Sequence, residues 1–270
     1  MDARQHTGPA AELLAWYSEI GVDIAIDETA QDRFSEASDL NSGPAPETKR
    51  AMPPLPRFGA VPIAPAATQT QQAAVTDARE RALAANTLDE LRAVLDTYDG
   101  LSLRKTATRL VFADGNPNAR VMFVGEAPGK DEDREGLPFV GRAGQLLDRM
   151  LAAIGLDRQQ AYIANIIPWR PPGNRTPTPQ EMELCLPFIR RQIELVNPDV
   201  LVLLGGSSSA ALTGAKDGIL KLRGRWLELD TGARTIKTLP TLHPAYLLRT
   251  PSQKKLAWRD FRALKATLDG

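Results

Sequence analysis

The feature that most constrains the fold is a regular alternation of short apolar segments with amphipathic ones along residues 81–270. Four apolar segments predict β-strands at Arg120–Val124, Ala161–Ile167, Asp199–Leu204 and Thr235–Pro240. Helical patterns lie at Arg142–Ile154, Pro179–Leu195 and Gln253–Leu268. Strands that alternate with helices form βαβ units, whose strands pair in parallel. The pattern therefore predicts an α/β protein, a three-layer αβα sandwich with a central, mostly parallel sheet of about four strands.

The first 80 residues differ in composition, which predicts three segments in the chain. A helical pattern that includes Trp16 and Tyr17 predicts an N-terminal helical appendage over residues 1–40. Residues 41–80 are rich in Pro, Ala and Gln, so we expect a disordered linker that adds nothing to a core. Residues 81–270 then form the folded domain. One helix is expected where it begins, from Ala78 to Asp96.

Composition narrows the class of protein. A chain of 270 residues that is 43% hydrophobic can bury one sizeable core. It has 1 cysteine, which excludes an internal disulfide. It shows no signal-peptide pattern and no apolar run of about 18 residues, the length of a membrane span. We therefore expect a cytoplasmic protein, and a monomer.

Charge is unevenly distributed, although the formal net charge is +0. Acidic residues outnumber basic ones by six within residues 1–80, and basic residues outnumber acidic ones by six within residues 81–270. A positive domain suits a polyanionic partner such as nucleic acid. An ordinary solvated surface explains the same count equally well. Charge alone therefore does not decide between the two interpretations.

Three motifs lie where predicted strands end. Gly125 opens a turn after the first strand, Asn165 is the polar residue of the second, and His243 follows the last. In parallel sheets, ligands bind beyond the carboxyl ends of the strands. We therefore expect the three motifs to converge on one site. The turn at Gly125 matches neither a P-loop nor a dinucleotide fingerprint, which excludes those two phosphate-binding motifs.

Three side chains near these strand ends have both a structural and a functional interpretation. Phe139, in a glycine-rich loop, either fills the core or offers a flat surface on which a base stacks. Asn165 either braces a neighbouring loop or reads a pyrimidine edge, because an amide both donates and accepts. His243 is one of 2 histidines. It is either structural or, given its place after the last strand, catalytic.

Four segments carry a family resemblance, namely Val121–Asp133, Gly136–Leu147, Tyr162–Arg175 and Thr241–Arg249. Together they resemble the family 4 uracil-DNA glycosylases, DNA-repair enzymes that carry a four-cysteine iron–sulfur cluster. The resemblance covers roughly residues 86–270. It implies a monofunctional, base-flipping hydrolase that cleaves the N-glycosidic bond of uracil and leaves an abasic site. The implied partner is uracil-containing DNA.

The resemblance also implies roles for individual residues. It implies catalytic roles for Glu126, Glu132 and His243, with the histidine on uracil O2 and a carboxylate near the positive sugar. Which carboxylate orients the attacking water stays open, and Glu132 is alternatively a residue that shapes the pocket against thymine. The implied substrate-binding residues are Gly125, Ala127, Phe139 and Asn165. Many glycosylases carry an Asp where Ala127 stands, so any carboxylate must come from a neighbour.

Basic and hydroxyl side chains near strand ends suit contacts to DNA phosphates. The expected DNA-binding residues are Arg142, Ser207, Arg223 and Arg249. Just before Arg249, Leu247 and Leu248 suit a wedge that enters the base stack and helps to extrude the target nucleotide. A plain surface role is the alternative for these residues.

The chain departs from the family at the iron–sulfur cluster. Matching the motifs places the four cluster positions at Tyr98, Leu101, Trp169 and Cys185. One thiolate cannot hold a cluster that needs four. We therefore expect no metal and no cofactor, with bulky Tyr98 and Trp169 filling part of the volume and Cys185 acting as a small buried hydrophobe. These four residues should cluster together in space.

Two other functions stay open. One is a glycosylase of different or broader base specificity, such as one for hypoxanthine or one that traps DNA covalently. Trapping relatives carry a histidine-containing loop, and the residues after Gly141 contain no such histidine. The other is a non-catalytic DNA-binding or polymerase-associated module. Such a module would tolerate the loss of Asn165 and His243, so their presence disfavours it.

Overall fold

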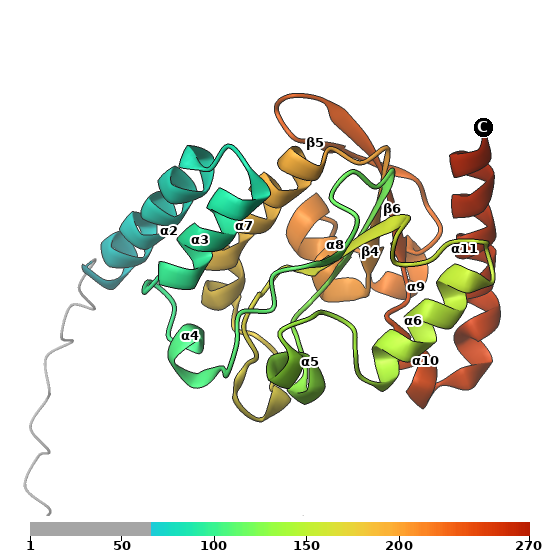
Figure 1. Ribbon diagram of the computed structural model, residues 1–270, viewed down its shortest axis with the longest axis horizontal. Coiled ribbons are helices and arrows are strands. Elements are labelled where there is room, and N and C mark those ends of the chain that lie inside the picture. The colour runs from blue at the N-terminus through green and yellow to red at the C-terminus, as the bar shows by residue number, and fades with distance from the viewer. Residues whose placement is uncertain (1–65) are drawn as a thin grey trace, which may run out of the picture. The chain divides into compact units, whose positions relative to one another are not determined.

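The computed structural model describes residues 66–270, which form an α/β sandwich (Figure 1). The appendage expected over residues 1–40 and the first part of the expected linker lie outside the described residues. At the centre is a six-stranded sheet in the order β1-β3-β2-β4-β6-β5. The strands are β1 (Asp114–Gly115), β2 (Val121–Gly125), β3 (Ala161–Asn165), β4 (Val200–Leu204), β5 (Leu227–Asp230) and β6 (Thr235–Thr241).

The four central strands are parallel, which confirms the prediction of a mostly parallel sheet. Strand β2 pairs with β3 on one side and with β4 on the other, and β4 pairs with β6. Two further strands were not predicted, and they close the edges in antiparallel pairs, β1 with β3 and β5 with β6. With 2 and 4 residues, they are too short for a side-chain alternation to stand out in the sequence.

The helices cover both faces of this sheet. They are α2 (Ala66–Ala84), α3 (Leu88–Thr97), α4 (Leu103–Thr106), α5 (Lys130–Glu135), α6 (Arg142–Ala152), α7 (Pro179–Val196), α8 (Gly206–Thr213), α9 (Ile219–Leu222), α10 (Pro244–Arg249) and α11 (Lys254–Asp269). Helices α6, α7 and α11 lie where the sequence predicts helices. Within residues 66–270, no helix has the length and apolar character that crossing a membrane requires.

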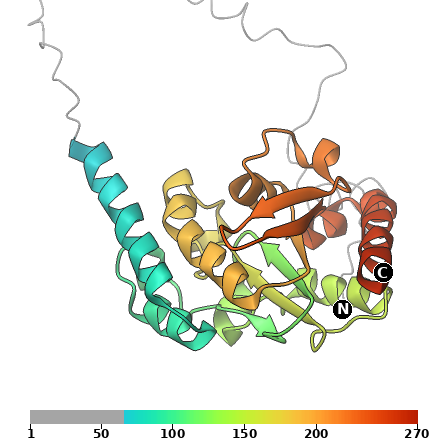
Figure 2. The ribbon, with the colours of Figure 1, turned by 90° about the horizontal axis from the view of Figure 1, so that it is seen from above.

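Successive side chains of each central strand point into two different cores, because strand side chains alternate between faces. Met122 and Val124 of β2 belong to the core on the side of α7, whereas Val121 and Phe123 belong to the core beneath α6 and α11. Figure 2 shows α7 and α11 on opposite sides of the sheet. Burial on both faces explains why these strands are continuous apolar runs in the sequence.

The expected linker is wrong for residues 66–80, and so is the domain boundary near residue 80. These residues form most of α2, which packs along α7 (Figure 1). The contact uses small side chains: Ala78 and Ala82 are 0% and 1% exposed, whereas Gln72 and Thr76 face solvent. Alanine lets two helix backbones approach closely, so a composition that suggested a linker builds a packed helix instead.

The single helix expected from Ala78 to Asp96 is also wrong, because the chain forms two helices there. Helix α2 ends at Ala84, and α3 begins after Thr87. The Thr87 hydroxyl accepts a hydrogen bond from the backbone N–H of Glu90 at 3.1 Å and so caps α3. The N-cap fixes the turn between the two helices.

Candidate active site

A cavity of about 530 Å³ lies at the carboxyl edge of the four parallel strands. Each strand supplies part of its wall: Glu126 follows β2, Asn165 ends β3, Leu204 ends β4 and His243 follows β6. The structure thus brings together the motifs that the sequence placed at strand ends. Of the predicted site residues, the wall contains Glu126, Ala127, Glu132, Phe139, Asn165, His243 and Arg249.

Gly125 lies beneath this wall, where the lack of a side chain is required. A Cβ on Gly125 would collide with Asn165 Oδ1 and would lie 2.7 Å from Phe139 Cζ. The amide and the aromatic ring therefore approach the end of β2 more closely than any other residue type would allow. Gly125 sets the position of the two side chains that are expected to contact a base.

Phe139 belongs to the core and also borders the cavity, and its role in stacking on a base stays a prediction. Its side chain packs in the core beneath α6 and also lines the cavity, and the residue is only 5% exposed. The ring centroid lies 5.6 Å from that of His243, with the planes inclined by 31°. Its backbone φ is 55°, in the left-handed region. This conformation costs a bulky residue on the order of 1–3 kcal/mol, so the surrounding contacts must hold it.

Asn165 carries a buried acceptor that is not satisfied. The residue is 4% exposed, and its Oδ1 has no hydrogen-bond partner among the described residues. A buried acceptor without a donor costs about 1–3 kcal/mol, and most such atoms in folded proteins are paired. Because Asn165 lines the cavity, an N–H group of a bound ligand can supply the missing partner.

His243 presents one ring nitrogen to the protein. Its Nδ1 accepts a hydrogen bond of 3.1 Å from the backbone N–H of Ala245, which caps α10. Burial lowers the pKa of His243 to about 4, and the positive charge of Arg249 acts in the same direction. The ring is therefore neutral at pH 7, and its hydrogen resides on Nε2 because Nδ1 is an acceptor. A neutral N–H donor thus belongs to the cavity wall.

The two predicted catalytic carboxylates have different surroundings. Both oxygens of Glu132 accept backbone N–H groups, from Gly129 at 3.0 Å and from Gly141 at 2.9 Å. Glu132 thereby joins the two ends of the loop that carries Phe139. Glu126 is half-buried in the cavity wall and makes no side-chain hydrogen bond within residues 66–270. Of the two, Glu126 is the carboxylate that is free to act on a ligand or a water.

The other acids of the same segment are structural or absent from the wall. Asp133 is 5% exposed and accepts hydrogen bonds from the Thr108 backbone N–H at 2.7 Å and from its hydroxyl at 2.9 Å. Asp131 pairs with Arg134 on the surface. Ala127 lines the cavity with a methyl group only. Of the acids in this segment, Glu126 and Glu132 line the cavity.

The expected DNA-binding residues lie in different environments, and one prediction is wrong. Arg249 is exposed and borders the cavity, Arg142 is exposed at the start of α6, and Ser207 is half-buried in the first turn of α8. The side chain of Arg223 is only 13% exposed and binds the buried carboxylate of Asp260, with one contact of 2.9 Å. That ion pair removes Arg223 from the surface available to DNA.

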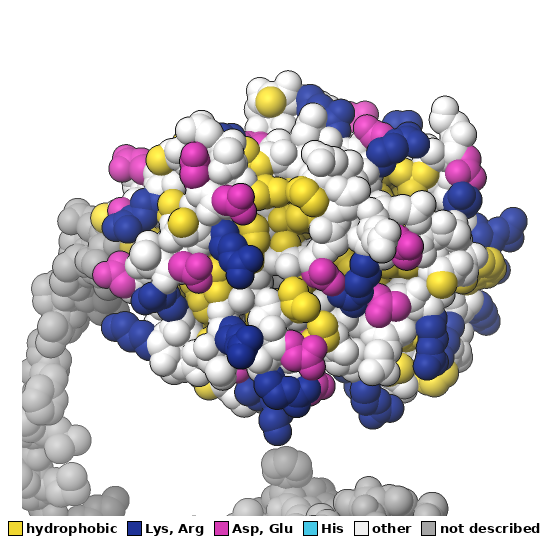
Figure 3. Space-filling view, in the orientation of Figure 1, with side chains coloured by type: hydrophobic (Ala, Val, Ile, Leu, Met, Phe, Trp, Pro, Cys, Tyr) yellow, Lys and Arg dark blue, Asp and Glu magenta, His cyan; other side chains and the backbone are white. Residues whose placement is uncertain are grey.

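The proposed wedge is also wrong for one of its two leucines. Leu247 is 1% exposed and packs in a small core with Leu242 and Ala257. Leu248 is half-buried, and its wedge role stays a prediction. Figure 3 shows Lys and Arg side chains, with Asp and Glu side chains among them, along the edge where Figure 1 places α5 and α10. At this edge Arg249 of α10 is exposed and borders the cavity, whereas Arg134 of α5 pairs with Asp131 and Glu135.

One wall was not predicted, the loop of residues 171–177 after β3, together with Tyr246 of α10. The loop is held by Arg175, which donates to both carboxylate oxygens of Glu181 at 2.8 and 2.6 Å. The hydrogen bond from Arg175 lowers the pKa of Glu181 to about 2, although burial acts in the opposite direction. The prolines and glycine of the loop are a turn signal, but a turn signal by itself does not indicate that the turn borders a site.

The four positions that match cluster cysteines all lie in the core on the side of α7. The exposed fractions are 1% for Tyr98, 3% for Leu101, 2% for Trp169 and 1% for Cys185. Burial raises the pKa of the Cys185 thiol well above its ordinary range, so the thiol stays protonated. Within residues 66–270, no group of three or more His, Cys, Asp or Glu side chains is arranged to hold a metal ion. One neutral thiol among apolar side chains does not fit a four-cysteine cluster.

The sequence matches the family model of the uracil DNA glycosylase superfamily over residues 112–262. The chain belongs to the uracil DNA glycosylase superfamily. The matched range contains the residues of the cavity wall, from Glu126 to Arg249. It also contains the central parallel sheet, so the superfamily match and the αβα fold describe the same part of the chain.

Relatives within this superfamily cover most of the described domain. A Type-4 uracil-DNA glycosylase of Thermotoga maritima is 46% identical over 153 residues, which is 56% of this chain and 78% of that protein. A Type-4 uracil-DNA glycosylase of Archaeoglobus fulgidus is 39% identical over 181 residues, which is 66% of this chain and 91% of that protein. A Type-5 uracil-DNA glycosylase of Pyrobaculum aerophilum is 35% identical over 106 residues, covering 34% of this chain and 46% of that protein. The family resemblance identified in the sequence is confirmed.

Proposed function

We propose that this protein is a uracil-DNA glycosylase, which excises uracil from DNA by hydrolysing the N-glycosidic bond and leaves an abasic site. One observation carries the proposal: the buried Oδ1 of Asn165 has no partner among the described residues, and Asn165 lines a cavity together with Phe139 and His243. Similarity to proteins named Type-4 uracil-DNA glycosylase supports it. The partner is uracil-containing DNA, whose phosphates meet the exposed Arg142 and Arg249.

The base is recognised by its edge and its face. Uracil presents an N3–H donor beside the O4 acceptor, and one amide group matches both because its oxygen accepts and its nitrogen donates. Uracil N3–H then satisfies Asn165 Oδ1. The ring of Phe139 supports the face of the base by stacking. A base inside a duplex cannot reach these groups, so the target nucleotide must turn out of the stack.

His243 stabilises the leaving group. Cleavage of the N-glycosidic bond leaves negative charge on uracil N1 and O2. The neutral imidazole donates from Nε2 to O2, where this charge develops. A donor aimed at developing charge stabilises the transition state more than the bound substrate, and one such donor contributes about 3–4 kcal/mol.

Glu126 assists the attack of water on the sugar. The deoxyribose becomes positively charged as the base leaves, and a nearby carboxylate stabilises that charge and orients the nucleophilic water. Glu132 instead keeps the loop of Phe139 in place, since both of its oxygens bind backbone N–H groups. Within the described residues, no lysine lines the cavity. Direct hydrolysis therefore fits these residues better than a Schiff-base route.

The proposed reaction runs without an iron–sulfur cluster, because the chain has 1 cysteine where such a cluster needs four. Purified protein should show no visible absorbance from a cluster and no stoichiometric iron by elemental analysis. One cluster's worth of iron per chain would overturn this part of the proposal, whatever the outcome of the activity assay.

The activity is tested with an oligonucleotide that contains a single uracil. We expect the strand to break at the uracil position only after alkaline treatment, as for a monofunctional enzyme that leaves an abasic site. Matched oligonucleotides with thymine, cytosine or hypoxanthine at the same position measure base specificity. DNA binding without excision would favour a binding module instead. Faster excision of hypoxanthine than of uracil would replace the proposed substrate.

A further inference from the structure

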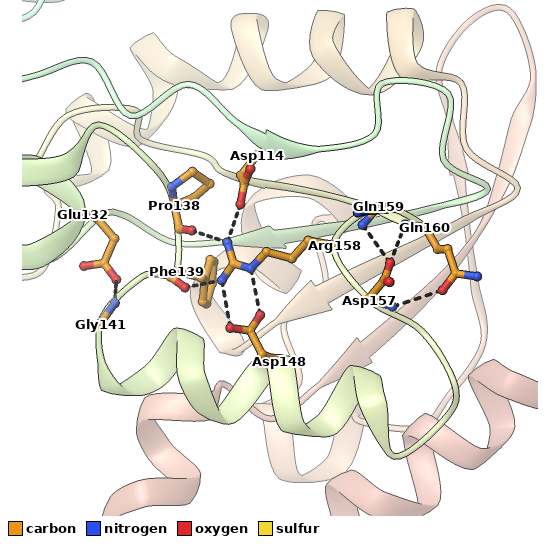
Figure 4. A network of polar contacts seen from close by, with 10 residues as sticks. All are labelled: Asp114, Glu132, Pro138, Phe139, Gly141, Asp148, Asp157, Arg158, Gln159 and Gln160. Atoms are coloured by element: carbon orange, nitrogen blue, oxygen red, sulfur yellow. Dashed lines mark hydrogen bonds and ion pairs between the residues drawn. The ribbon is translucent and has the colours of Figure 1, made fainter.

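One arginine binds the backbone on which the stacking ring is mounted. Arg158 lies in the segment before β3 and is not part of the cavity wall. Its Nη1 donates to the carbonyl oxygen of Pro138 at 3.1 Å, and its Nη2 donates to the carbonyl oxygen of Phe139 (Figure 4). Both carbonyl groups belong to the loop that delivers Phe139 to the cavity.

Two carboxylates fix the guanidinium in its turn. Arg158 Nε donates to Asp148 of α6 at 2.8 Å, and Nη1 donates to Asp114 of β1 at 2.5 Å (Figure 4). The side chain of Arg158 is 25% exposed, so water only partly screens these ion pairs. The contacts connect β1, α6 and the loop of Phe139 at a single group. A planar guanidinium with five N–H donors can do this, whereas a lysine ammonium cannot.

The carbonyl group of Phe139 is enclosed on its other side by α6. A Cβ on Gly144 would collide with the Phe139 carbonyl oxygen, so this oxygen lies directly against the helix backbone. The φ of 55° at Phe139 is a conformation that bulky residues rarely adopt. With its carbonyl held between Gly144 and Arg158, Phe139 keeps its ring beside Gly125 at the cavity.

We infer that Arg158 is a positioning residue for uracil excision: it clamps the Phe139 backbone in the left-handed conformation and so holds the stacking ring in the cavity. The inference rests on the proposed function, because it requires Phe139 to stack on the base. Glu132 binds the N–H of Gly141 in the same loop (Figure 4), so the loop is fixed on both sides of the ring.

The test is Arg158→Lys, which keeps the positive charge and loses the fork of donors. We expect single-turnover excision to slow about tenfold, because a displaced ring no longer supports the base. Affinity for uracil-containing DNA should stay within about twofold, since Arg158 does not line the cavity. In a Phe139→Leu background, the same substitution should slow excision less than about twofold, because the ring that Arg158 positions is gone.

Arg191→Lys is the matched control. Arg191 also joins a backbone carbonyl, that of Ala85 at 2.9 Å, to a carboxylate, that of Glu194 at 2.8 Å, and its side chain is 20% exposed. It belongs to α7 and does not line the cavity. We expect it to lower the melting temperature about as much as Arg158→Lys does while leaving the excision rate unchanged.

The outcomes separate the inference from the function on which it rests. Equal slowing by Arg158→Lys with and without the Phe139 ring would show a general structural role and overturn the inference, as would an unchanged rate. Should Arg158→Lys fail to fold, Asp148→Asn loosens the same clamp, and it must slow excision only where Phe139 is present. A wild-type protein without uracil excision defeats both ideas. If the wild type excises uracil and Arg158→Lys does so at the same rate, only this inference fails.

Discussion

Two buried polar atoms, Asn165 Oδ1 and the Tyr98 hydroxyl, both lack a hydrogen-bond partner among the described residues, but their surroundings differ. Asn165 lines a cavity, whereas the ring of Tyr98 packs against Phe188 with a centroid distance of 5.0 Å and its hydroxyl lies close against Gly100. Both atoms lower the stability of the fold. Only Asn165 adjoins space in which a ligand can restore the lost hydrogen bond. An unpaired polar atom therefore indicates a binding site only where there is room for its partner.

The cavity and the core around Trp169 differ in a similar way. The cavity combines the unpaired amide of Asn165, the left-handed backbone of Phe139 and the neutral ring of His243. The core around Trp169 holds apolar side chains in ordinary packing. Substitutions in the cavity should therefore change catalysis with little effect on stability, and substitutions in the core should do the reverse.

The largest effect is expected for Asn165→Ala. Loss of the amide removes the group that reads the uracil edge, so the single-turnover rate should fall about a thousandfold. The free energy of unfolding should stay the same or rise, because an unpaired buried acceptor is removed. DNA affinity, measured by fluorescence anisotropy, should change little. Equal losses in rate and in DNA affinity would refute the base-reading role.

Trp169→Ala should have an effect on stability that is comparable, in free energy, to the effect of Asn165→Ala on the rate. Removing this buried ring leaves a cavity in the core, which should lower the free energy of unfolding by about 3–5 kcal/mol in a denaturant titration. Trp258, on α11, is 45% exposed, and Trp258→Ala should change the same quantity by only about 0.5 kcal/mol. If the two substitutions cost the same, Trp169 does not support the fold as described.

His243→Asn should affect catalysis and spare the fold. Asparagine can still cap α10, because its side-chain oxygen accepts the Ala245 N–H, but it loses the Nε2 donor. Excision should slow by about several hundredfold, the cost of one donor to developing charge. The melting temperature should remain close to that of the wild type. A large drop in melting temperature with a normal rate would reassign His243 to structure.

The pH dependence of stability tests the environment of the same histidine. The folded-state pKa of His243 is about 4, below its ordinary value of 6.5. As the pH falls through this window, the unfolded chain takes up a proton that the folded chain does not, so stability decreases. The loss should reach about 2 kcal/mol between pH 7 and pH 5. His243→Asn serves as the control, and a pH profile identical to that of the wild type would contradict the shifted pKa.

The smallest effect is expected for Tyr98→Phe, which deletes the unpaired hydroxyl in the core. The free energy of unfolding should rise by about 1 kcal/mol, with excision unchanged. Tyr162→Phe is the control, because the Tyr162 hydroxyl accepts a hydrogen bond of 2.9 Å from Gln192. That substitution should lower stability by about the same amount. Destabilisation by both would mean that the Tyr98 hydroxyl is satisfied after all.

The sequence predicts the central fold well, because its signals are local and apolar. The four parallel strands and helices α6, α7 and α11 are long enough to show their periodicity. The first part of α2, before Ala78, escaped prediction because its contacts with the core come from small residues such as Ala74, which form no stripe of large apolar residues. Its apolar side is recognisable only once α7 is seen against it.

The residues of the site could also be predicted only in part. Phe139, Asn165 and His243 could be brought together from the sequence because parallel strands deliver their carboxyl ends to one edge. The partners of the charged residues could not be predicted from the sequence. Arg223 binds Asp260 and Glu132 binds backbone amides, and both arrangements depend on distances that no sequence pattern reports. The sequence therefore located the cavity, but it did not show which charged residues near it are bound to structural partners.

Each of the four parallel strands supplies part of the cavity wall, so the groups that surround a base meet only when these four strands have assembled. A chain in which one of these strands is melted loses the residues that this strand contributes to the pocket. Recognition of a base therefore depends on the tertiary structure of the domain and on no single local segment.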